Sequence, residues 1–304
     1  MRSSDVARRT ILARSNGDGG FAAHRARPST TESTAWAAMA LESGARRDAA
    51  LNWLLANQLP GGAWPVGPGY SEPSWMTTSA LLALTDNPDH PGAEESVRRG
   101  ARWLISQRSR RFPFLNRLFY RLWPDKVAVR LDIELRAWPW TDGAFAWCEP
   151  TAMAMLAIDK IDPSLRPGTS AFRWNEGRRL LLDRVCDGGG WNYGNSLVLG
   201  EELWPYPDTT AIVLLSLAAG PSDPRIESSV GALRRMIENG VSTLALSLAA
   251  LALEAYGEDS ADLRRRVSLQ WAEAPMGVTT RSAALSAIVL QGGGSPFRAG
   301  EAHA

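Results

Sequence analysis

Two kinds of helical segment alternate along this chain, and the alternation limits the folds open to it more than any other feature. Six segments are apolar on nearly every side. Four of them begin at residues 32, 75, 149 and 208, and weaker copies begin near Ser242 and Arg281. A helix without a polar face has to be buried all round. These segments therefore predict an inner layer of helices.

Six segments of a second kind lie between the apolar ones, and each has one polar side. In 46–57, for example, Leu51, Leu54 and Leu55 share a face while the charged residues 46–48 lie outside it. This spacing is typical of an amphipathic surface helix. The predicted segments are 4–15, 46–57, 92–107, 170–185, 224–238 and 260–273. Six outer helices around six inner ones predict an all-α fold, the α6/α6 toroid, as a single domain over 1–304 with a flexible tail at 293–304.

A second repeat lies in the loops that precede the apolar segments. Gln58 to Trp64 fits the pattern Q-x3-G-x-W, and 16–21 and 186–191 are variants that end in Phe21 and Trp191. Glycine at the end of an outer helix permits the left-handed turn that stops the helix, and the aromatic residue can then pack back across the loop. These loops account for part of the thirteen tryptophans, an unusual number beside five tyrosines and seven phenylalanines.

Together, these loops and the Thr-Ala-x3-Leu inner segments resemble the repeats of squalene/hopene cyclases, class II terpene cyclases and protein prenyltransferase β subunits. The resemblance extends from about residue 4 to 292. It implies the same toroid, whose inner helices enclose a cavity and point their first residues into its mouth. It also implies an isoprenoid or another apolar small molecule as ligand. One fold hosts many activities, so the fold alone does not define the function.

Three carboxylates occupy the same place in this repeat, two residues before the threonine that each copy carries. They are Glu32, Glu149 and Asp208. Aspartate at the start of a helix commonly acts as an N-cap. Glu149 precedes Pro150, and proline favours the first helical position, so Glu149 is also predicted at an N-cap. Its alternative roles are an ion pair inside the mouth or a second carboxylate beside Asp208.

The residues around Asp208 resemble a catalytic motif as well. Tyr206-Pro-Asp208-Thr209-Thr-Ala is similar to the D-x-D-D-T-A and D-x-D-T-T motifs of class II cyclases. In that family the middle aspartate protonates an alkene or an epoxide, so the resemblance implies Asp208 as a general acid with Glu149 as its partner. Tyr206 stands where the family has its first aspartate. The network that tunes acidity in the family is therefore incomplete here.

Aromatic residues cluster near the starts of the apolar segments. Packing in the core and in loops explains many of them, but aromatic faces also stabilise cations and apolar ligands. The predicted substrate-binding residues are Glu32, Trp36, Trp75, Trp140, Trp147, Tyr206 and Thr209. Trp138 and Trp204 belong to the same sequence cluster. The two functions left open are metal-independent isoprenoid cyclisation, and isoprenoid or lipid binding without catalysis by a carrier or scaffold subunit.

One segment interrupts the repeat. The interval from Thr77 to Thr151 exceeds that from Thr34 to Thr77 by about thirty residues, which marks an insert at about 107–142. The insert is rich in arginine and carries phenylalanine and leucine between the arginines. It is interpreted either as a flap packed over the mouth, as a helix that contacts an anionic membrane surface, or as a contact for a protein partner.

Composition excludes several other classes. The 33 basic and 32 acidic residues balance to a net charge of +1, which gives no global attraction to nucleic acid. Cys148 and Cys186 lie in no zinc-binding pattern, and the three histidines match no metal site of the prenyltransferases, so no metal and no cofactor are expected. No segment has the length of a signal peptide's apolar run or of a membrane span. The predicted location is cytoplasmic, with or without membrane association.

Overall fold

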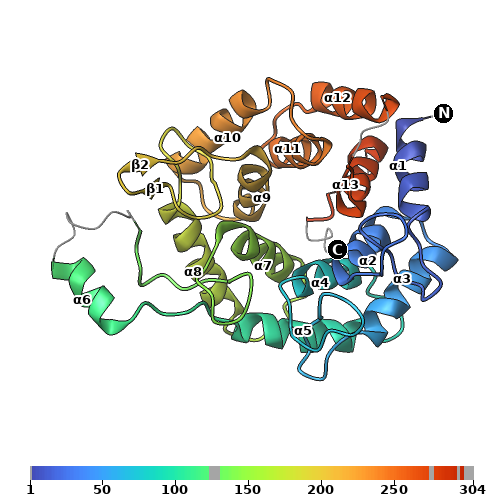
Figure 1. Ribbon diagram of the computed structural model, residues 1–304, viewed down its shortest axis with the longest axis horizontal. Helices are drawn as coiled ribbons and strands as arrows, with labels where there is room; N and C mark the ends of the chain where they lie inside the picture. The colour runs from blue at the N-terminus through green and yellow to red at the C-terminus, as the bar shows by residue number, and fades with distance from the viewer. Residues whose placement is uncertain (1, 123–130, 274–276, 293–294, 298–304) are drawn as a thin grey trace.

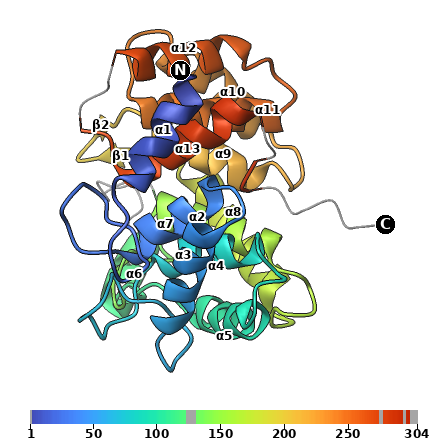
Figure 2. The ribbon, with the colours of Figure 1, turned by 90° about the vertical axis from the view of Figure 1, so that its right-hand side faces the viewer.

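The computed structural model describes residues 2–122, 131–273, 277–292 and 295–297. Over these ranges, twelve helices form two concentric rings, which Figure 1 shows from one end and Figure 2 from the side. The inner ring consists of α2 (Thr31–Ala40), α4 (Thr77–Thr85), α7 (Cys148–Lys160), α9 (Pro207–Leu217), α11 (Thr243–Ala255) and α13 (Thr280–Gln291). The outer ring consists of α1 (Ser3–Leu12), α3 (Ala45–Ala56), α5 (Ala93–Ser106), α8 (Ser170–Asp183), α10 (Pro224–Met236) and α12 (Ala261–Ala272). The predicted α6/α6 toroid is confirmed.

The inner helices contact one another in the order α2, α4, α7, α9, α11 and α13, and α13 returns to α2. Each of the outer helices α3, α5, α8, α10 and α12 packs on the inner helix that precedes it, and α1 packs on α13. Almost every residue of the inner helices is buried, whereas the outer helices bury one face. The apolar surface of the inner ring is therefore covered from outside by amphipathic helices, as the alternating pattern predicts.

Within the described residues, a repeated pattern of hydrogen bonds fastens four of the six loops to the inner helix that follows. The threonine in the first turn of the inner helix accepts a hydrogen bond from the backbone N–H of the loop aromatic, at 2.9 Å for Thr34 and Phe21, Thr77 and Trp64, and Thr210 and Trp191, and at 3.3 Å for Thr151 and Trp138. The indole Nε1 of each tryptophan donates to a carbonyl of the preceding outer helix, at 2.6 to 2.8 Å. We call this arrangement the threonine–aromatic clamp.

The glutamine and glycine of the loop pattern have their own roles. Gln58 donates to the carbonyls of Gly62 and Ser96, which joins the loop to α5. Gly62 has φ of +95°, and a Cβ atom there would lie 2.4 Å from the carbonyl oxygen of Arg99. Only glycine fits this left-handed and crowded position.

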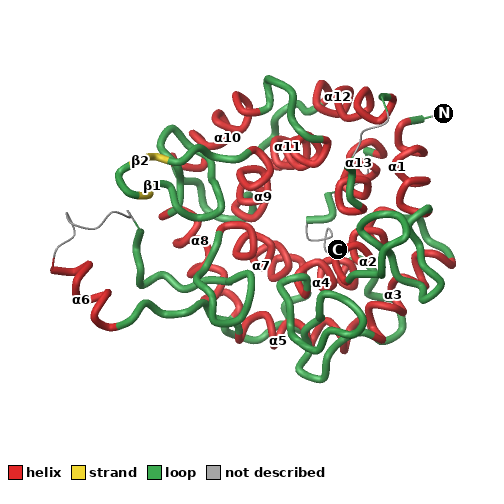
Figure 3. The backbone as a smooth tube through the Cα atoms, in the orientation of Figure 1, coloured by secondary structure: helices red, strands yellow, loops and turns green. Residues whose placement is uncertain are grey.

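Two elements break the regular alternation. Helix α6 (Phe114–Leu122) lies in the predicted insert and stands away from the rings, so the insert does not form a flap packed on the mouth within its described residues. Strands β1 (Leu197–Val198) and β2 (Glu201–Glu202) form a short antiparallel hairpin in which Leu197 pairs with Glu202 (Figure 3). Leu199 and Gly200 at its tip both have positive φ, of 53° and 85°, which is typical of a tight two-residue hairpin turn.

The predicted flexible tail at 293–304 lies mostly outside the described residues. Ser295 to Phe297 are described, and Phe297 is buried with its ring 5.9 Å from that of Trp36 on α2. Lys160 at the end of α7 donates to the carbonyl of Pro296 and forms an ion pair with Asp86. This short segment therefore packs inside the ring near the ends of α4 and α7.

We expect the threonine–aromatic clamp to be a measurable source of stability. Thr210→Val keeps the side-chain volume but leaves the buried backbone N–H of Trp191 without its partner, which should lower the free energy of unfolding by about 1–3 kcal/mol. Urea denaturation followed by circular dichroism would measure the change. The matched control is Thr169→Val, because Thr169 is exposed and its side chain caps no helix N–H. Equal stability of the two variants would contradict a structural role for the clamp.

Candidate functional site

The first turns of three inner helices meet through one arginine, and this meeting point defines the mouth of the ring. Arg281 of α13 donates from both Nη1 and Nη2 to Oε1 of Glu149 on α7, each at 2.9 Å. Its Nη1 also lies 3.4 Å from Oε1 of Glu32 on α2. Helices α7 and α13 are three places apart in a ring of six. The ion pair between Arg281 and Glu149 therefore bridges opposite sides of the inner ring.

These side chains come together because they share one place in the repeat. Glu32, Glu149, Asp208 and Arg281 are each the second residue of their inner helix. The prediction that the carboxylates occupy equivalent positions is confirmed by the helix bounds. Arg281 was missed as a site residue, although the repeat itself, extended to its sixth and weakest copy, marks this position.

Burial and the charges of neighbouring side chains together shift the pKa values of Arg281 and Glu32. The side chains of Arg281, Glu149 and Glu32 are 14%, 16% and 22% exposed. Burial alone lowers the pKa of Arg281, but the negative charges of Glu149 and Glu32 outweigh it and raise the pKa overall. Burial raises the pKa of Glu32, and the negative charge of Glu149 adds to this rise while Arg281 opposes it. Glu32 thus favours its protonated form more than an ordinary glutamate does.

Asp208 does not cap its helix. The N-cap of α9 is Tyr206, and Oδ1 of Asp208 accepts a hydrogen bond only from the adjacent backbone N–H of Thr209, at 3.0 Å, within the described chain. The prediction of an N-cap is therefore wrong. Asp208 is half-buried, and its charge helps to raise the pKa of Arg281 and, after burial, that of Tyr193. Asp208 thus acts electrostatically on the same mouth that Glu32 and Glu149 line.

Glu149 is not an N-cap either. Helix α7 begins at Cys148 with Trp147 as its N-cap, so Glu149 lies within the first turn and Pro150 follows at the third position. The interpretation of Glu149 as half of an ion pair in the mouth is confirmed by its contacts with Arg281. Thr209 is 2% exposed, so its side chain is packed between helices rather than open to the mouth.

Trp36 lies beneath the charged cluster. It is fully buried, and the guanidinium of Arg281 lies 5.7 Å from the centre of its ring. Phe297 contacts the same ring edge to face. Within the described chain, Nε1 of Trp36 and Nε of Arg281 are buried without a hydrogen-bond partner. The ring of Trp36 therefore lies at the floor of the mouth. Two buried N–H donors there have no hydrogen-bond partner within the described chain.

Trp75 and Trp140 form a separate cleft at the rim. Their rings are perpendicular with centres 4.7 Å apart, and they line a space of about 470 Å³ together with Trp103 and Trp138. Its charged lining residues are Glu72 and Asp142. Both are exposed, so this cleft is open to solvent and has an acidic edge.

Trp147 and Tyr206 border the start of α7 and α9. The ring of Tyr206 is 42% exposed and lies 5.0 Å from that of Tyr193, at a tilt of 45°. Trp147 is half-buried and borders a pocket of about 180 Å³ beside Phe145. The predicted aromatic residues therefore divide between the floor of the mouth and separate parts of the rim.

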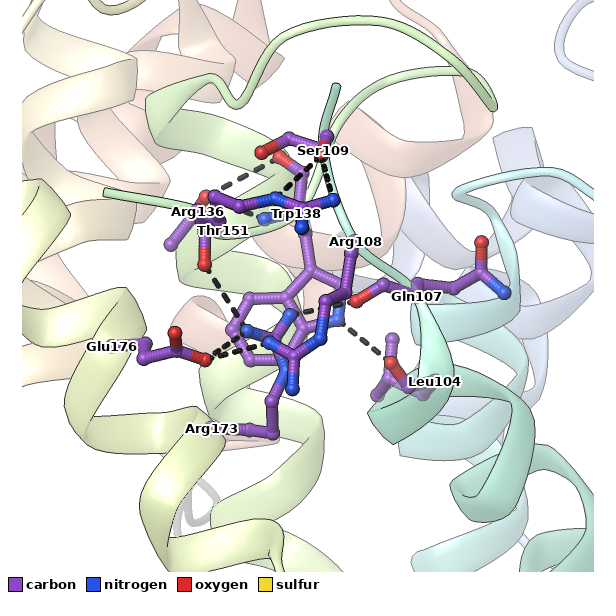
Figure 4. A network of polar contacts seen from close by, with 9 residues as sticks. All are labelled: Leu104, Gln107, Arg108, Ser109, Arg136, Trp138, Thr151, Arg173 and Glu176. Carbon is purple, nitrogen blue, oxygen red and sulfur yellow. Dashed lines mark hydrogen bonds and ion pairs between the residues drawn. The ribbon is translucent and has the colours of Figure 1, made fainter. Parts of the chain in front are cut away.

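Trp138 belongs mainly to the core, although it also borders the cleft of Trp75 and Trp140. It is 3% exposed and is the clamp aromatic of α7, a role hidden in the sequence because Trp138 falls inside the predicted insert 107–142. Figure 4 shows the guanidinium of Arg173 over its ring, at 4.3 Å from the ring centre. Arg173 also donates to the carbonyls of Gln107 and Arg136. This network ties both ends of the insert to α8.

Trp204 lies outside the mouth cluster too, since it is 83% exposed. Among the described residues, no group of three or more His, Cys, Asp and Glu side chains is placed to hold a metal ion. In the same part of the chain, every helix is too short or too polar to cross a bilayer.

Known structures share this architecture. An endo-1,4-D-glucanase from Vibrio fischeri is similar over 94% of this chain and 93% of its own, with a TM-score of 0.57 and 12% identity. An alpha-amylase from Clostridium perfringens is similar over 95% of this chain and 97% of its own, with a TM-score of 0.60 and 10% identity. The family 8 glycosyl hydrolase endoglucanase from Klebsiella pneumoniae is similar over 94% of this chain and 98% of its own, with a TM-score of 0.54 and 14% identity.

These likenesses show the toroid fold. No family model matches the chain, and no curated protein matches it either. The resemblance to terpene cyclases and prenyltransferases thus correctly predicted the class of fold, while membership of that family has no support from the comparisons. The assigned roles of Glu32, Glu149, Asp208 and the aromatic residues stay predictions.

We expect the bridge across the ring to be essential for stability. Arg281→Met leaves Glu149 and Glu32 buried without their cation, which should cost about 3–5 kcal/mol of unfolding free energy at neutral pH. The double variant Arg281→Met/Glu149→Gln should recover part of this loss. Arg265→Met, which breaks an exposed ion pair on α12, is the control and should cost less than about 1 kcal/mol. If the loss of unfolding free energy in the double variant equals the sum of the losses in the two single variants, Arg281 and Glu149 are not directly coupled.

The raised pKa of Glu32 predicts a pH-dependent effect of its removal. A carboxyl with a raised pKa in the folded state stabilises the fold below its unfolded pKa, and this contribution is lost as the pH rises through the folded value. Relative to the unchanged protein, Glu32→Gln should therefore have a higher melting temperature at about pH 8 than it has, by the same comparison, at about pH 4. Differential scanning fluorimetry would measure both shifts, with the exposed Glu227→Gln on α10 as control. The reverse order of the two shifts would rule out burial as the dominant effect on Glu32.

Proposed function

We propose that the mouth binds a glycan and hydrolyses a glycosidic bond. The observation that carries this proposal is the convergence of Glu32, Glu149 and Asp208 around Arg281, beside exposed aromatic rings. Glycoside hydrolysis most often uses two carboxyl groups, one protonated acid and one ionised partner. Carboxylates and a guanidinium suit the hydroxyl groups of a sugar, and aromatic rings suit its apolar faces.

The residues differ in a way that suggests their roles. Glu32 has the raised pKa that suits a general acid, which would donate its proton to the glycosidic oxygen as the bond to the sugar carbon breaks. Asp208 accepts one hydrogen bond within the described chain, so it is the carboxylate best able to take a proton from an attacking water. Glu149 is held by two hydrogen bonds to Arg281 and would keep that guanidinium in place.

The rim supplies a place for neighbouring sugar units. The cleft between Trp75 and Trp140 offers indole rings with Glu72 and Asp142 at its edge, a combination that suits a neutral polyhydroxylated ligand. The glucanase and amylase of similar fold give a precedent for glycan chemistry on a toroid, although identities of 10–14% support only the fold itself.

Isoprenoid cyclisation with Asp208 as the acid is the second candidate. The paired rings of Tyr193 and Tyr206 near Asp208 favour it, because aromatic faces stabilise carbocations. The solved structures of similar fold named above are a glucanase, an amylase and an endoglucanase, so they give it no precedent. Isoprenoid or lipid binding without turnover, by a carrier or a scaffold subunit, would use the same aromatic lining.

Substitution of the two proposed catalytic carboxyls tests the glycan proposal. Purified protein would be incubated with β-1,4-glucan, mixed-linkage glucan and starch, and new reducing ends would be measured. Asp208→Asn and Glu32→Gln should each lower the rate by about 10²- to 10⁴-fold. Glu227→Gln removes an exposed carboxylate on α10 and should leave the rate unchanged.

The outcomes separate the candidates. Release of reducing ends that is insensitive to both substitutions would remove Glu32 and Asp208 from catalysis. Products from isoprenoids of 15 to 30 carbons, lost in Asp208→Asn, would favour cyclisation instead. Isoprenoid binding without any product would favour the carrier.

A further inference from the structure

Helix α6 presents an apolar face that no part of the described chain buries. Phe114, Leu115, Leu118 and Leu122 are 71%, 76%, 40% and 55% exposed, and no residue of α6 is buried. Their spacing places them on one side of the helix. A contiguous exposed apolar row marks an interaction surface more often than an isolated exposed residue does.

The polar side of α6 is held against the returning part of the insert, so the apolar side faces away from it. Arg117 donates to Glu134 on the returning part of the insert, and Arg111 lies 3.5 Å from the same carboxylate. Phe112, just before the helix, stacks on Phe145 with ring centres 4.4 Å apart. The ends of the insert are held by Arg173 and Trp138 (Figure 4). The helix is thus anchored by its polar side, with its leucines facing outward.

The charge of this segment has one sign. From Gln107 to Leu122 the sequence contains five arginines and no acidic residue, although the whole chain carries a net charge of only +1. Two of these arginines share the single carboxylate of Glu134, and Arg108 pairs with Glu176. Positive charge beside an exposed apolar row is complementary to a surface that is itself apolar and negatively charged.

Like α6, the segment between α8 and α9 joins an outer helix to the next inner helix, and it too carries exposed apolar side chains. Leu199 at the tip of the hairpin is 80% exposed, and Trp204 just before α9 is 83% exposed. Figure 2 shows α6 and the hairpin toward the same end of the barrel. The first turns that form the mouth lie at this end as well.

From these observations we propose that α6 seats the protein on an anionic lipid bilayer, with the mouth of the ring toward the membrane. The leucines and Phe114 enter the interface between headgroups and acyl chains, and the exposed Arg110 and Arg121 contact acidic headgroups. The space of about 1040 Å³ beside α6 is lined by its Arg117, Tyr120 and Arg121, so it lies on the polar side of the helix and leaves the apolar row free for a flat bilayer. A helix with so few apolar residues gives reversible rather than permanent attachment.

Vesicle sedimentation tests this proposal independently of any enzymatic activity. Full-length protein would be mixed with vesicles of phosphatidylcholine alone and with vesicles that contain about one third phosphatidylglycerol. We expect binding to the anionic vesicles only, weakened by added salt. Leu115→Glu/Leu118→Glu should weaken this binding at least about 10-fold, because it places charges on the inserting face.

The matched control is Phe172→Glu on α8, which is 60% exposed and lies in an outer helix at its opposite end from the mouth loops. It should bind like the unchanged protein, and circular dichroism should show that all variants are folded. Equal binding to both kinds of vesicle, or none to either, would overturn the proposal. Self-association of the unchanged protein that Leu115→Glu/Leu118→Glu abolishes, without vesicle binding, would assign the surface to a second copy of the chain.

Discussion

The hydrogen bond from the backbone of a loop aromatic to the threonine of the next inner helix is the contact on which this architecture depends. Helices that are apolar on all sides have no preferred orientation of their own, because any face can be buried. The clamp fixes the starts of α2, α4, α7 and α9 relative to the loops before them. At α4, α7 and α9 the indole Nε1 also fixes the loop to the preceding outer helix, so this part of the ring is built from defined units.

The equivalent first turns of the inner helices decide which side chains meet at the mouth of the ring. In four of the six inner helices the second residue is brought to the mouth, so a small set of positions determines the charge there. Here those positions hold three carboxylates and one arginine. The resulting cluster combines an ion pair that bridges the ring with a buried carboxyl group, Glu32, whose pKa is raised.

Much of this arrangement could be predicted from the sequence, since helix periodicity and buried length are local properties. The alternation of segments correctly predicted both rings. The shared repeat position correctly predicted that Glu32, Glu149 and Asp208 occupy equivalent places in their helices. Arg281 escaped notice because its segment lacks the Thr-Ala signature, and the partner of a carboxylate across a ring depends on closure in three dimensions. Trp138 was misplaced because the insert separates it from the outer helix that it contacts, and the N-cap assignments failed because helix starts shift by one or two residues.

Closure of the ring has a consequence for how the protein is made. The last inner helix, α13, contacts α1 and α2, and Thr280 at its start donates to the carbonyl of Ala22. A chain emerging from the ribosome therefore holds an incomplete arc until α13 is synthesised, and the apolar sides of α2 and α11 lack their neighbour during that interval. Such an arc exposes surface that favours aggregation. Nascent chains that stall shortly before residue 280 are thus the species for which a chaperone would matter most.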